Sequence, residues 1–358
     1  MTDTATFSPL RTPTATRQVG HGDMFTDHMA TATWTEGLGW SPLALGPREP
    51  IPMNPAMIGL HYAQVVFEGL KAHRQFDGSM AVFRPGENAR RFQRSARRLA
   101  MPELPADDFL RAVDAVVGAD ESWLSDDPAL SLYLRPLMFA TESNLMLRPS
   151  REYRFLVIAF VAGGFFGDTV KPVSVWVSHD HTRATPGGTG DVKCAANYGP
   201  SFVAQLEAQR AGCQQVIWLD ATERRWVEEM GGMNLFFVRG RGAGAAVVTP
   251  ELTGTLLPGV TRDSLLTLAR RLGLGVSEER VSLEQWRSEV RQGLITEVFA
   301  CGTAAVVTPV GQVRDRDGDF RIGDGEPGAV TMALREALVD LQHGLAPDPD
   351  GWMRPVLG

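Results

Sequence analysis

The segment Gly190-Asp191-Val192-Lys193-Cys194-Ala195-Ala196-Asn197-Tyr198-Gly199 places one lysine among small and apolar residues. It follows a glycine-rich stretch at 185–190 and precedes an apolar helical pattern at 201–211. Lysine is usually exposed, but an ammonium that is partly out of water has a lowered pKa and becomes a nucleophilic amine. Such an amine forms Schiff bases with carbonyl compounds. The alternative is a half-buried lysine whose charged end reaches back to solvent.

The composition of the chain is that of an ordinary globular protein. Its 358 residues, 44% hydrophobic and 22% charged, are enough for two domains. A formal net charge of −7 argues against a general nucleic-acid binder. No apolar run reaches the length of a membrane span, and the polar N-terminus lacks the apolar core of a signal peptide. We therefore expect a flexible segment at 1–20, no membrane partner and a cytoplasmic location.

The cysteines and histidines give little sign of a disulfide or metal framework. Cys194, Cys213 and Cys301 are odd in number and far apart, which favours a reducing compartment. The triplet His179-Asp180-His181 has the chemistry of a metal site, but solvated side chains at a strand end are the favoured interpretation.

The first half of the chain predicts strands and two amphipathic helices. Apolar residues at helical spacing predict helices at 87–100 and 105–119, and alternating or apolar runs predict strands at 80–84, 130–139 and 152–161. A strand or hairpin is expected at 25–40, and a core helix or strand at 58–71. The consecutive glycines at 163 and 164 mark a bend, where we place the domain boundary.

The second half predicts a strand at 172–177, a hairpin at 216–220 and 226–230, and helices at 261–272 and 330–341. In the hairpin, period-two alternation predicts that Glu228 and Glu229 face opposite sides, one toward solvent and one toward the core. A buried carboxylate needs a charged or hydrogen-bonding partner. The first predicted helix carries five arginines. A solvated face explains four of them, but Arg91 flanks the apolar stripe and is therefore a candidate anion ligand.

Four segments together resemble one enzyme family. Gly-Asp-x-Lys-x-x-x-Asn-Tyr around Lys193, Glu-x-Gly-x-x-Asn from Glu229, Pro258-Gly259-Val260-Thr261-Arg262 and Gly302-Thr303-Ala304 are similar to motifs of the branched-chain amino-acid aminotransferases, which are pyridoxal-phosphate enzymes of fold type IV. The resemblance implies a two-domain α+β or α/β fold with a smaller N-terminal α/β domain (21–162), an interdomain loop (163–173) and a larger C-terminal cofactor-binding domain with a pseudo-barrel (174–358).

The resemblance also implies a set of site residues. Lys193 is the residue that holds the cofactor, Glu229 binds its pyridine nitrogen and Tyr198 its ring oxygen. The other expected cofactor ligands are Arg91, Leu257, Val260, Thr261 and Thr303. The expected substrate residues are Phe25, Tyr62, Phe67, Tyr133, Arg135, Phe165, Thr303 and Ala304. For Tyr133 and Arg135, an edge strand with a wet face is the alternative.

Some positions depart from the family pattern. Certain members carry threonine where Gly232 stands and tyrosine where Phe165 stands, so two polar contacts are expected to be missing. Ala305 and Thr308 replace the redox cysteine pair of mammalian members, so that thiol regulation is not expected.

The function implied by the resemblance is transfer of an amino group between leucine, isoleucine or valine and 2-oxoglutarate, by a homodimer whose sites are completed across two subunits. D-amino-acid aminotransferase and aminodeoxychorismate lyase activities, on the same fold, are alternatives. A non-catalytic cofactor-binding or interaction protein is an alternative of another class.

Overall fold

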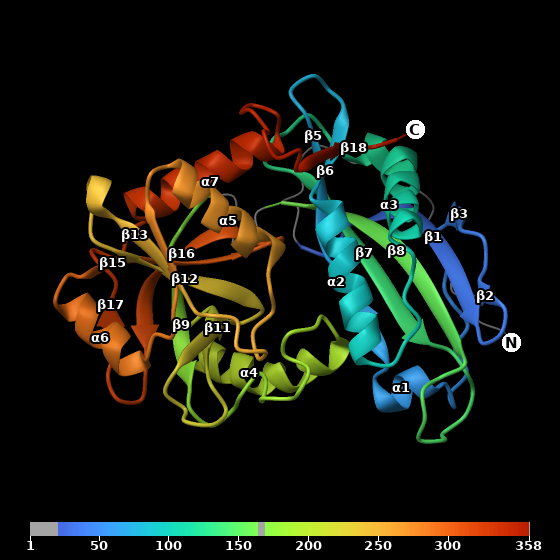
Figure 1. Cartoon of the computed structure of the whole chain (residues 1–358), viewed down its shortest axis with the longest axis horizontal. Coiled ribbons are helices and arrows are strands. Elements are labelled where there is room, and N and C mark those ends of the chain that lie inside the picture. The colour runs from blue at the N-terminus through green and yellow to red at the C-terminus, as the bar shows by residue number, and fades with distance from the viewer. Residues whose placement is uncertain (1–20, 164–168, 358) are drawn as a thin grey trace, which may run out of the picture.

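The computed structural model describes residues 21–163 and 169–357, which form two halves, each built on a nine-stranded sheet. Figure 1 shows the two halves side by side, with helix α2 standing between them. Within the described residues, no helix combines the length and the apolar character that a membrane span requires.

The first sheet is antiparallel and runs in the order β18-β6-β5-β7-β8-β1-β2, with β3 paired to β1 and β4 to β7. Its strands are β1 (Phe25–Thr35), β2 (Gly39–Trp40), β3 (Ala44–Pro47), β4 (Val65–Phe67), β5 (Leu70–Arg74), β6 (Met80–Phe83), β7 (Ser131–Ala140), β8 (Glu152–Ala162) and β18 (Met353–Pro355). Its helices are α1 (Ile58–Tyr62), α2 (Pro85–Arg98) and α3 (Ala106–Asp120), followed by the short 3-10 turn Glu121–Trp123.

The core of this half lies between the sheet and helices α2 and α3. Phe92 on α2 and Phe109 on α3 are each no more than 1% exposed and pack against Phe155 of β8. The predicted helices and strands are confirmed, with bounds that shift by a few residues. The edge-strand alternative for 130–139 is wrong, because β7 pairs with β5 and β8 and lies inside the sheet.

The second sheet mixes parallel and antiparallel pairs in the order β11-β10-β9-β16-β15-β12-β13-β14. The pairing of β11 with β12 closes the first six of these strands into a barrel. Its strands are β9 (Val173–Ser178), β10 (Gln215–Leu219), β11 (Val227–Met230), β12 (Met233–Arg239), β13 (Ala246–Thr249), β14 (Gly275–Glu278), β15 (Ile295–Gly302), β16 (Val306–Arg314) and β17 (Phe320–Arg321). Its helices are α4 (Phe202–Arg210), α5 (Val260–Arg271), α6 (Leu283–Arg291) and α7 (Ala329–Gln342), with 3-10 turns at Ala195–Asn197, Gly199–Ser201 and Gly242–Gly244.

Two features of the fold differ from the sequence predictions. The segment 58–71 is not one element but α1, β4 and β5, because Ala63 has a φ of 54° and ends α1 in the left-handed region. The chain also crosses back at its end, since β18 pairs with β6 of the first sheet. The last strand therefore does not stay with the second sheet.

Candidate active site

A cavity of about 250 Å³ lies where the two sheets meet, and segments far apart in the sequence line it. Eleven of the sequence-predicted residues are in its wall: Phe67, Arg91, Tyr133, Arg135, Lys193, Tyr198, Leu257, Val260, Thr261, Thr303 and Ala304. We call it the active-site cavity. Cofactor and substrate pockets of this size are typical at the junction of two structural units.

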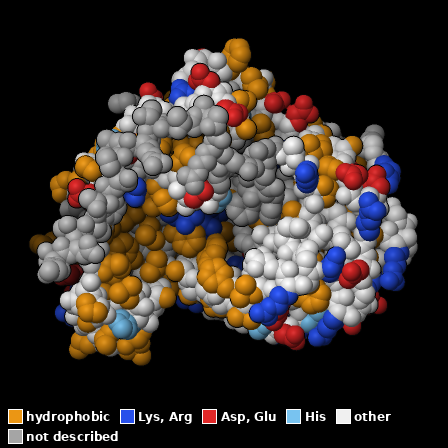
Figure 2. Space-filling model, turned by 180° about the vertical axis from the view of Figure 1, so that it is seen from behind, with side chains coloured by type: hydrophobic (Ala, Val, Ile, Leu, Met, Phe, Trp, Pro, Cys, Tyr) orange, Lys and Arg blue, Asp and Glu red, His pale blue; other side chains and the backbone are white. Residues whose placement is uncertain are grey.

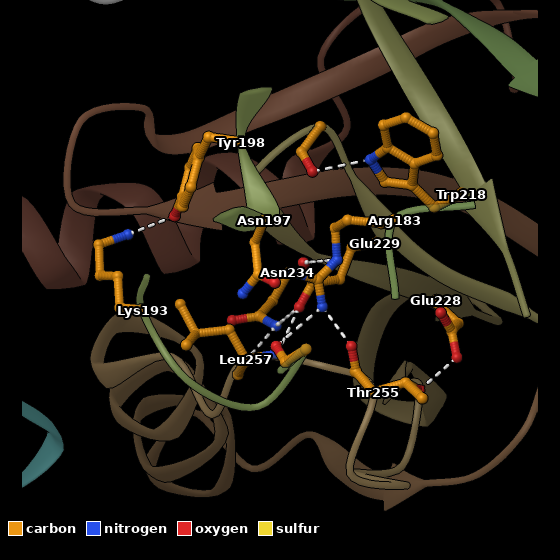
Figure 3. Close-up of polar contacts among 12 residues, drawn as sticks. Arg183, Lys193, Asn197, Tyr198, Trp218, Glu228, Glu229, Asn234, Thr255 and Leu257 are labelled. Atoms are coloured by element: carbon orange, nitrogen blue, oxygen red, sulfur yellow. Dashed lines mark hydrogen bonds and ion pairs between the residues drawn. The ribbon is translucent and has the colours of Figure 1, made fainter. Parts of the chain in front are cut away.

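Lys193 reaches this cavity from a loop that is fixed on both sides. Its backbone N–H donates to Ser95 Oγ of α2 at 2.9 Å, and its carbonyl accepts from the N–H of Phe67 at 3.1 Å. The Nζ atom lies 2.7 Å from the Tyr198 hydroxyl, as Figure 3 shows, and 4.9 Å from the centre of the Phe67 ring. The amine is therefore directed by a hydroxyl and an aromatic face.

Asn197 explains why this loop holds its shape. Its side-chain amide donates to the carbonyl oxygens of Val192 and Thr189, and its Oδ1 accepts from the Thr189 hydroxyl at 2.7 Å. A Cβ at Gly190 would lie 2.3 Å from the carbonyl oxygen of Thr255, so glycine allows the close approach of the two loops there.

Glu229, on β11, is a buried carboxylate with three partners. It is 2% exposed, and its oxygens lie 3.0 Å from Arg183 Nε and 2.6 Å from the backbone N–H of Leu257. Asn234 Nδ2 is at 3.5 Å. Burial raises the pKa of Glu229, and the charge of Arg183 opposes that rise. This carboxylate borders a small side cavity that shares Tyr198, Gly232 and Leu257 with the active-site cavity.

Arg183 is a site residue that the sequence reasoning missed. Besides Glu229, its guanidinium contacts the carbonyl oxygens of Gly190 and Thr255, and Figure 3 shows it lying between Glu229 and Thr255. A signal existed in the sequence, since a buried glutamate requires a cationic partner, but nothing in the spacing indicates which of the arginines supplies it.

The prediction that one of the two adjacent glutamates faces solvent is wrong. Glu228 is 5% exposed and bonds the hydroxyl of Thr255. The two side chains do leave β11 on opposite sides (Figure 3), but both are covered, because the loop that carries Thr255 and Leu257 contacts both carboxylates. Burial raises the pKa of Glu228.

Arg91 is the only buried arginine of α2, as predicted, and Glu68 fixes it. Glu68 oxygens lie 2.7 Å from Arg91 Nε and 2.8 Å from Nη2, and Nη1 donates to the carbonyl oxygen of Pro258 at 3.2 Å. Burial alone would raise the pKa of the fully buried Glu68, but the charge and hydrogen bonds of Arg91 hold it below its ordinary value. Asn88 adds a bond to Glu68 at 2.9 Å.

The first turn of α5 lies at the cavity wall with its backbone N–H groups uncapped by a side chain. Its N-cap is Gly259, which makes no side-chain cap bond, and Val260 and Thr261 follow it in the cavity wall. A Cβ at Gly259 would lie 2.1 Å from Asn234 Oδ1, so any larger residue there would displace the Asn234 side chain, which bonds the carbonyl oxygen of Leu257. Free N–H groups and the positive end of the helix dipole make such a turn an anion seat.

The opposite wall is the turn 303–305 between β15 and β16. The Thr303 hydroxyl donates to the carbonyl oxygen of Gly69 at 3.0 Å, which ties the second sheet to the first. Tyr133 and Arg135 of β7 also reach the cavity, and the Arg135 guanidinium lies 4.9 Å from the centre of the Phe67 ring. This side is therefore aromatic with one cation.

His21 is a second residue that the sequence reasoning missed. Its ring lies edge-on to Tyr133 and Phe160, with ring centres 5.0 Å apart in each case, and it lines the cavity. Burial, together with Lys71 and Arg135, lowers the pKa of His21 to about 4. No motif marks this position, because a lone histidine near a chain end carries no pattern.

Two predicted substrate residues, Phe25 and Tyr62, do not line the active-site cavity. Phe25 packs one layer behind it, with its ring centre 5.7 Å from that of Phe160. Tyr62 is 45% exposed on α1, where its hydroxyl donates to the carbonyl oxygen of Leu145 at 3.0 Å. Phe165 lies outside the described residues.

The alternative metal site does not bring its residues together. His179 Nε2 lies 2.6 Å from Asp315 Oδ1, whereas His181 pairs with Glu207 at 3.3 Å. Asp315 is in turn bonded to Arg287, so that its charge is already matched.

Comparison with known proteins identifies the family. Residues 65–313 match the family model described as amino-transferase class IV. The chain belongs to this family. It is 56% identical to a probable branched-chain-amino-acid aminotransferase of Streptomyces coelicolor over 338 residues, which are 94% of this chain and 92% of that protein. It is 53% identical to the branched-chain-amino-acid aminotransferase of Mycolicibacterium smegmatis, over 93% of this chain and 91% of that protein.

Solved structures of aminotransferases show the same fold. The branched-chain amino acid aminotransferase of Escherichia coli superposes with a TM-score of 0.75 at 30% identity, covering 93% of this chain and all of that one. The T.th. branched-chain amino acid aminotransferase with pyridoxamine 5'-phosphate gives 0.73 at 30% identity, covering 91% of this chain and 98% of that one. The predicted fold type is thereby confirmed.

Proposed function

We propose that this class IV aminotransferase uses pyridoxal 5'-phosphate to move an amino group between L-leucine, L-isoleucine or L-valine and 2-oxoglutarate. The observation that carries the proposal is one amine, Lys193 Nζ, bonded to the Tyr198 hydroxyl at the wall of the active-site cavity, with a buried carboxylate, Glu229, in the adjoining side cavity that shares Tyr198. The names of the relatives in Streptomyces and Mycolicibacterium support the substrate class.

The chain offers a contact for each part of the cofactor. Lys193 would take the aldehyde carbon, Glu229 the pyridine nitrogen and Tyr198 the ring oxygen. The first turn of α5, Arg91 and Thr303 would hold the phosphate through N–H, guanidinium and hydroxyl groups, as their positions around one cavity permit. The predicted cofactor ligand Leu257 contributes its backbone N–H to Glu229, so it fixes the carboxylate.

The catalytic work falls to Lys193. When bound, pyridoxal phosphate supplies an electron sink for the substrate α carbon. The Lys193 amine would take the proton from that carbon and give it to the cofactor carbon that was the aldehyde, which is general acid–base work by a positioned group. The Tyr198 hydroxyl orients the amine, and Glu229, whose raised pKa is opposed by the charge of Arg183, would keep a proton on the ring nitrogen.

The substrate side of the cavity suits an apolar side chain with one carboxylate. Phe67 and Tyr133 supply aromatic walls, and Arg135, over the Phe67 ring, supplies a cation for the second carboxylate of glutamate. The N–H groups of turn 303–305, with Ala304, are suited to the α-carboxylate.

We propose a homodimer on the basis of an exposed apolar surface. Leu60 and Tyr62 of α1 and residues 145–147 are each 45–90% exposed. Figure 2 shows apolar side chains gathered on the lower part of the half formed by the first sheet. Exposed apolar patches of this kind mark protein interfaces. We expect a cytoplasmic enzyme of two subunits, in which the exposed Tyr62 would contribute to its neighbour's site.

The test is the visible absorption spectrum of the purified enzyme with added L-leucine, and glutamate formation from L-leucine and 2-oxoglutarate. We expect the spectrum to change with L-leucine and glutamate to form. In Lys193→Ala we expect the spectral response to be lost and turnover to fall roughly 10³-fold or more. Lys171→Ala, at an exposed lysine, is the matched control.

Turnover of D-alanine or aminodeoxychorismate without L-leucine would contradict the proposed substrate class. If added pyridoxal phosphate did not change the absorption spectrum of the protein, the protein would be a non-catalytic member of the family. Sedimentation of the native enzyme as a monomer would contradict the dimer.

A further inference from the structure

A second cavity of about 130 Å³ lies on the far side of turn 303–305 from the active-site cavity. The two cavities share Ala304 and Ala305 in their walls. The second cavity is formed by β5 of the first sheet, β16 and helix α7 of the second, so it too lies where the two halves meet. None of the residues assigned to the cofactor lines it apart from this turn.

The second cavity is lined by three lysine or arginine side chains, Lys71, Lys171 and Arg335, and none of them has an acidic partner among the described residues. Lys71 is 7% exposed, and among the described residues its Nζ has one hydrogen-bond partner, the carbonyl oxygen of Ala304 at a long 3.4 Å. Arg335 of α7 likewise contacts only a carbonyl oxygen, that of Val307 at 3.4 Å. The described residues in the wall include no aspartate or glutamate. Buried charges are normally paired.

Two histidines complete the polar side of this cavity. His73 is 4% exposed, yet neither ring nitrogen has a hydrogen-bond partner among the described residues. Its ring lies edge-on to that of His343 with centres 5.0 Å apart. Burial, and then the charge of Lys71, lower the pKa of His73 well below its ordinary value, so the ring is neutral at pH 7 and offers one N–H donor. Buried polar atoms without partners are rare in proteins.

We propose that the second cavity is a binding site for a small aliphatic carboxylate. The anion would accept hydrogen bonds from Lys71, His73 and Arg335, which are the groups whose partners are missing or distant. An apolar tail would meet Leu130, Val307 and Val339, which line the rest of the wall. This apolar lining favours a carboxylate over inorganic phosphate. The proposal does not depend on the amino acid that the enzyme uses.

The chain has three lysines, Lys71, Lys171 and Lys193, which makes chemical protection a direct test. The cofactor-loaded enzyme is treated with cyanate at pH 8, and carbamoylation of Lys71 is followed by peptide mass spectrometry. A free lysine peptide in the same solution shows whether an additive changes the reactivity of cyanate itself. We expect isobutyrate to slow modification of Lys71 at least threefold in a saturable way. Isobutyramide, a neutral molecule of similar shape, and sodium chloride at the same ionic strength should not.

Arg335→Gln separates this site from the active site. We expect the variant to lose most of the protection at Lys71 while isobutyrate still competes with L-leucine in the turnover assay, because Arg335 does not line the active-site cavity. Arg94→Gln, at an exposed arginine of α2, should keep the protection. The visible spectrum of the bound cofactor shows whether each variant is folded.

Several results would overturn the proposal. One is a Lys71 that does not react with cyanate at all, since the site would then be closed to ligands. Others are no protection by isobutyrate, equal protection by isobutyramide or chloride, and full protection in Arg335→Gln. Stronger protection by inorganic phosphate than by isobutyrate would contradict the ligand class. None of these results depends on whether L-leucine is a substrate.

Discussion

The active-site cavity and the second cavity lie on opposite sides of turn 303–305, but they differ in how far their charged side chains are paired. In the active-site cavity Arg91 is paired with Glu68 and Lys193 bonds the Tyr198 hydroxyl, and Glu229, beside the cavity, is paired with Arg183. On the substrate side, Arg135 has no acidic partner among the described residues and lies over the rings of Phe67 and Tyr133. In the second cavity, Lys71 and Arg335 have only distant carbonyl oxygens among the described residues. The cofactor side of the first cavity is therefore held by paired groups, whereas the second cavity leaves positive charge for a ligand to match.

Removing one member of a buried pair should have the largest effect. We expect Glu68→Ala to lower the free energy of unfolding of the cofactor-free enzyme by about 3–5 kcal/mol, because Arg91 would be left buried without a counter-charge. Urea unfolding measures the loss. Glu103→Ala, which breaks the exposed pair with Arg97, should change stability little. Equal losses in the two variants would show that the Glu68 pair is not special.

Removing Arg183 should leave Glu229 buried without an ion-pair partner, as Lys71 is in the second cavity. Burial already raises the pKa of Glu229 and Arg183 opposes it, so Arg183→Met should raise this pKa further. The proposed role requires ionised Glu229. The acid limb of the kcat–pH profile should therefore move to higher pH by about 1–3 units, with roughly tenfold slower turnover at pH 7.

Glu228→Gln is the matched control for that shift. The charge of Glu228 raises the pKa of Glu229, so its removal should move the acid limb the opposite way, to lower pH. If both variants moved the limb in the same direction, electrostatic control of Glu229 would be ruled out.

A smaller effect is expected at the hydroxyl beside the reactive amine. Tyr198→Phe removes the 2.7 Å hydrogen bond to Lys193 Nζ and leaves the ring in place. A hydrogen bond contributes about 0.5–1.5 kcal/mol net, so we expect kcat to fall about two- to tenfold with the cofactor still bound. Steady-state kinetics and the visible spectrum measure both. Loss of the cofactor instead would assign Tyr198 a binding role alone.

The titration of Lys71 should affect turnover least, but it tests the charge in the second cavity most directly. Burial and then Arg335 lower its pKa to about 8 from 10.5, and His73, His343 and His21 are the other ionisable groups around it. The folded protein releases this proton more readily than the unfolded chain, so burial of Lys71 costs stability at pH 7, and the cost fades between pH 8 and 10.5. Lys71→Met should therefore gain stability at pH 7 and lose that gain by pH 10.

Thermal unfolding over that pH range measures the difference between Lys71→Met and the wild type. A gain that stayed constant with pH would mean that Lys71 titrates normally, and the contrast between the two cavities would be weakened.

The sequence predicted the parts of the site that depend on local pattern. Lys193 and Tyr198 are five residues apart in one motif, and the α5 turn and turn 303–305 each lie within one short segment, so their chemistry can be recognised locally. The structure brings these segments to one cavity. The sequence also distinguished Arg91 from the other arginines of α2, because Arg91 lies beside the apolar stripe.

The partners of these residues could not be predicted in the same way. Arg183 and Glu229 are 46 positions apart, and Lys71 meets Ala304 from the other sheet. Such pairs depend on how the sheets are placed, which periodicity does not report. The burial of Glu228 has the same cause, because alternation gives the side of a strand but not whether a distant loop, here the one that carries Thr255, covers that side.

The return of β18 to the first sheet affects how the chain can fold during synthesis. Met353–Pro355 pairs with β6, about 270 positions earlier. All of the closed barrel leaves the ribosome before this strand does. Until β18 has been synthesised, β6 therefore remains an edge strand of the N-terminal sheet, with one side unpaired. The hydrogen bonds between β6 and β18 form after the rest of the chain has been made.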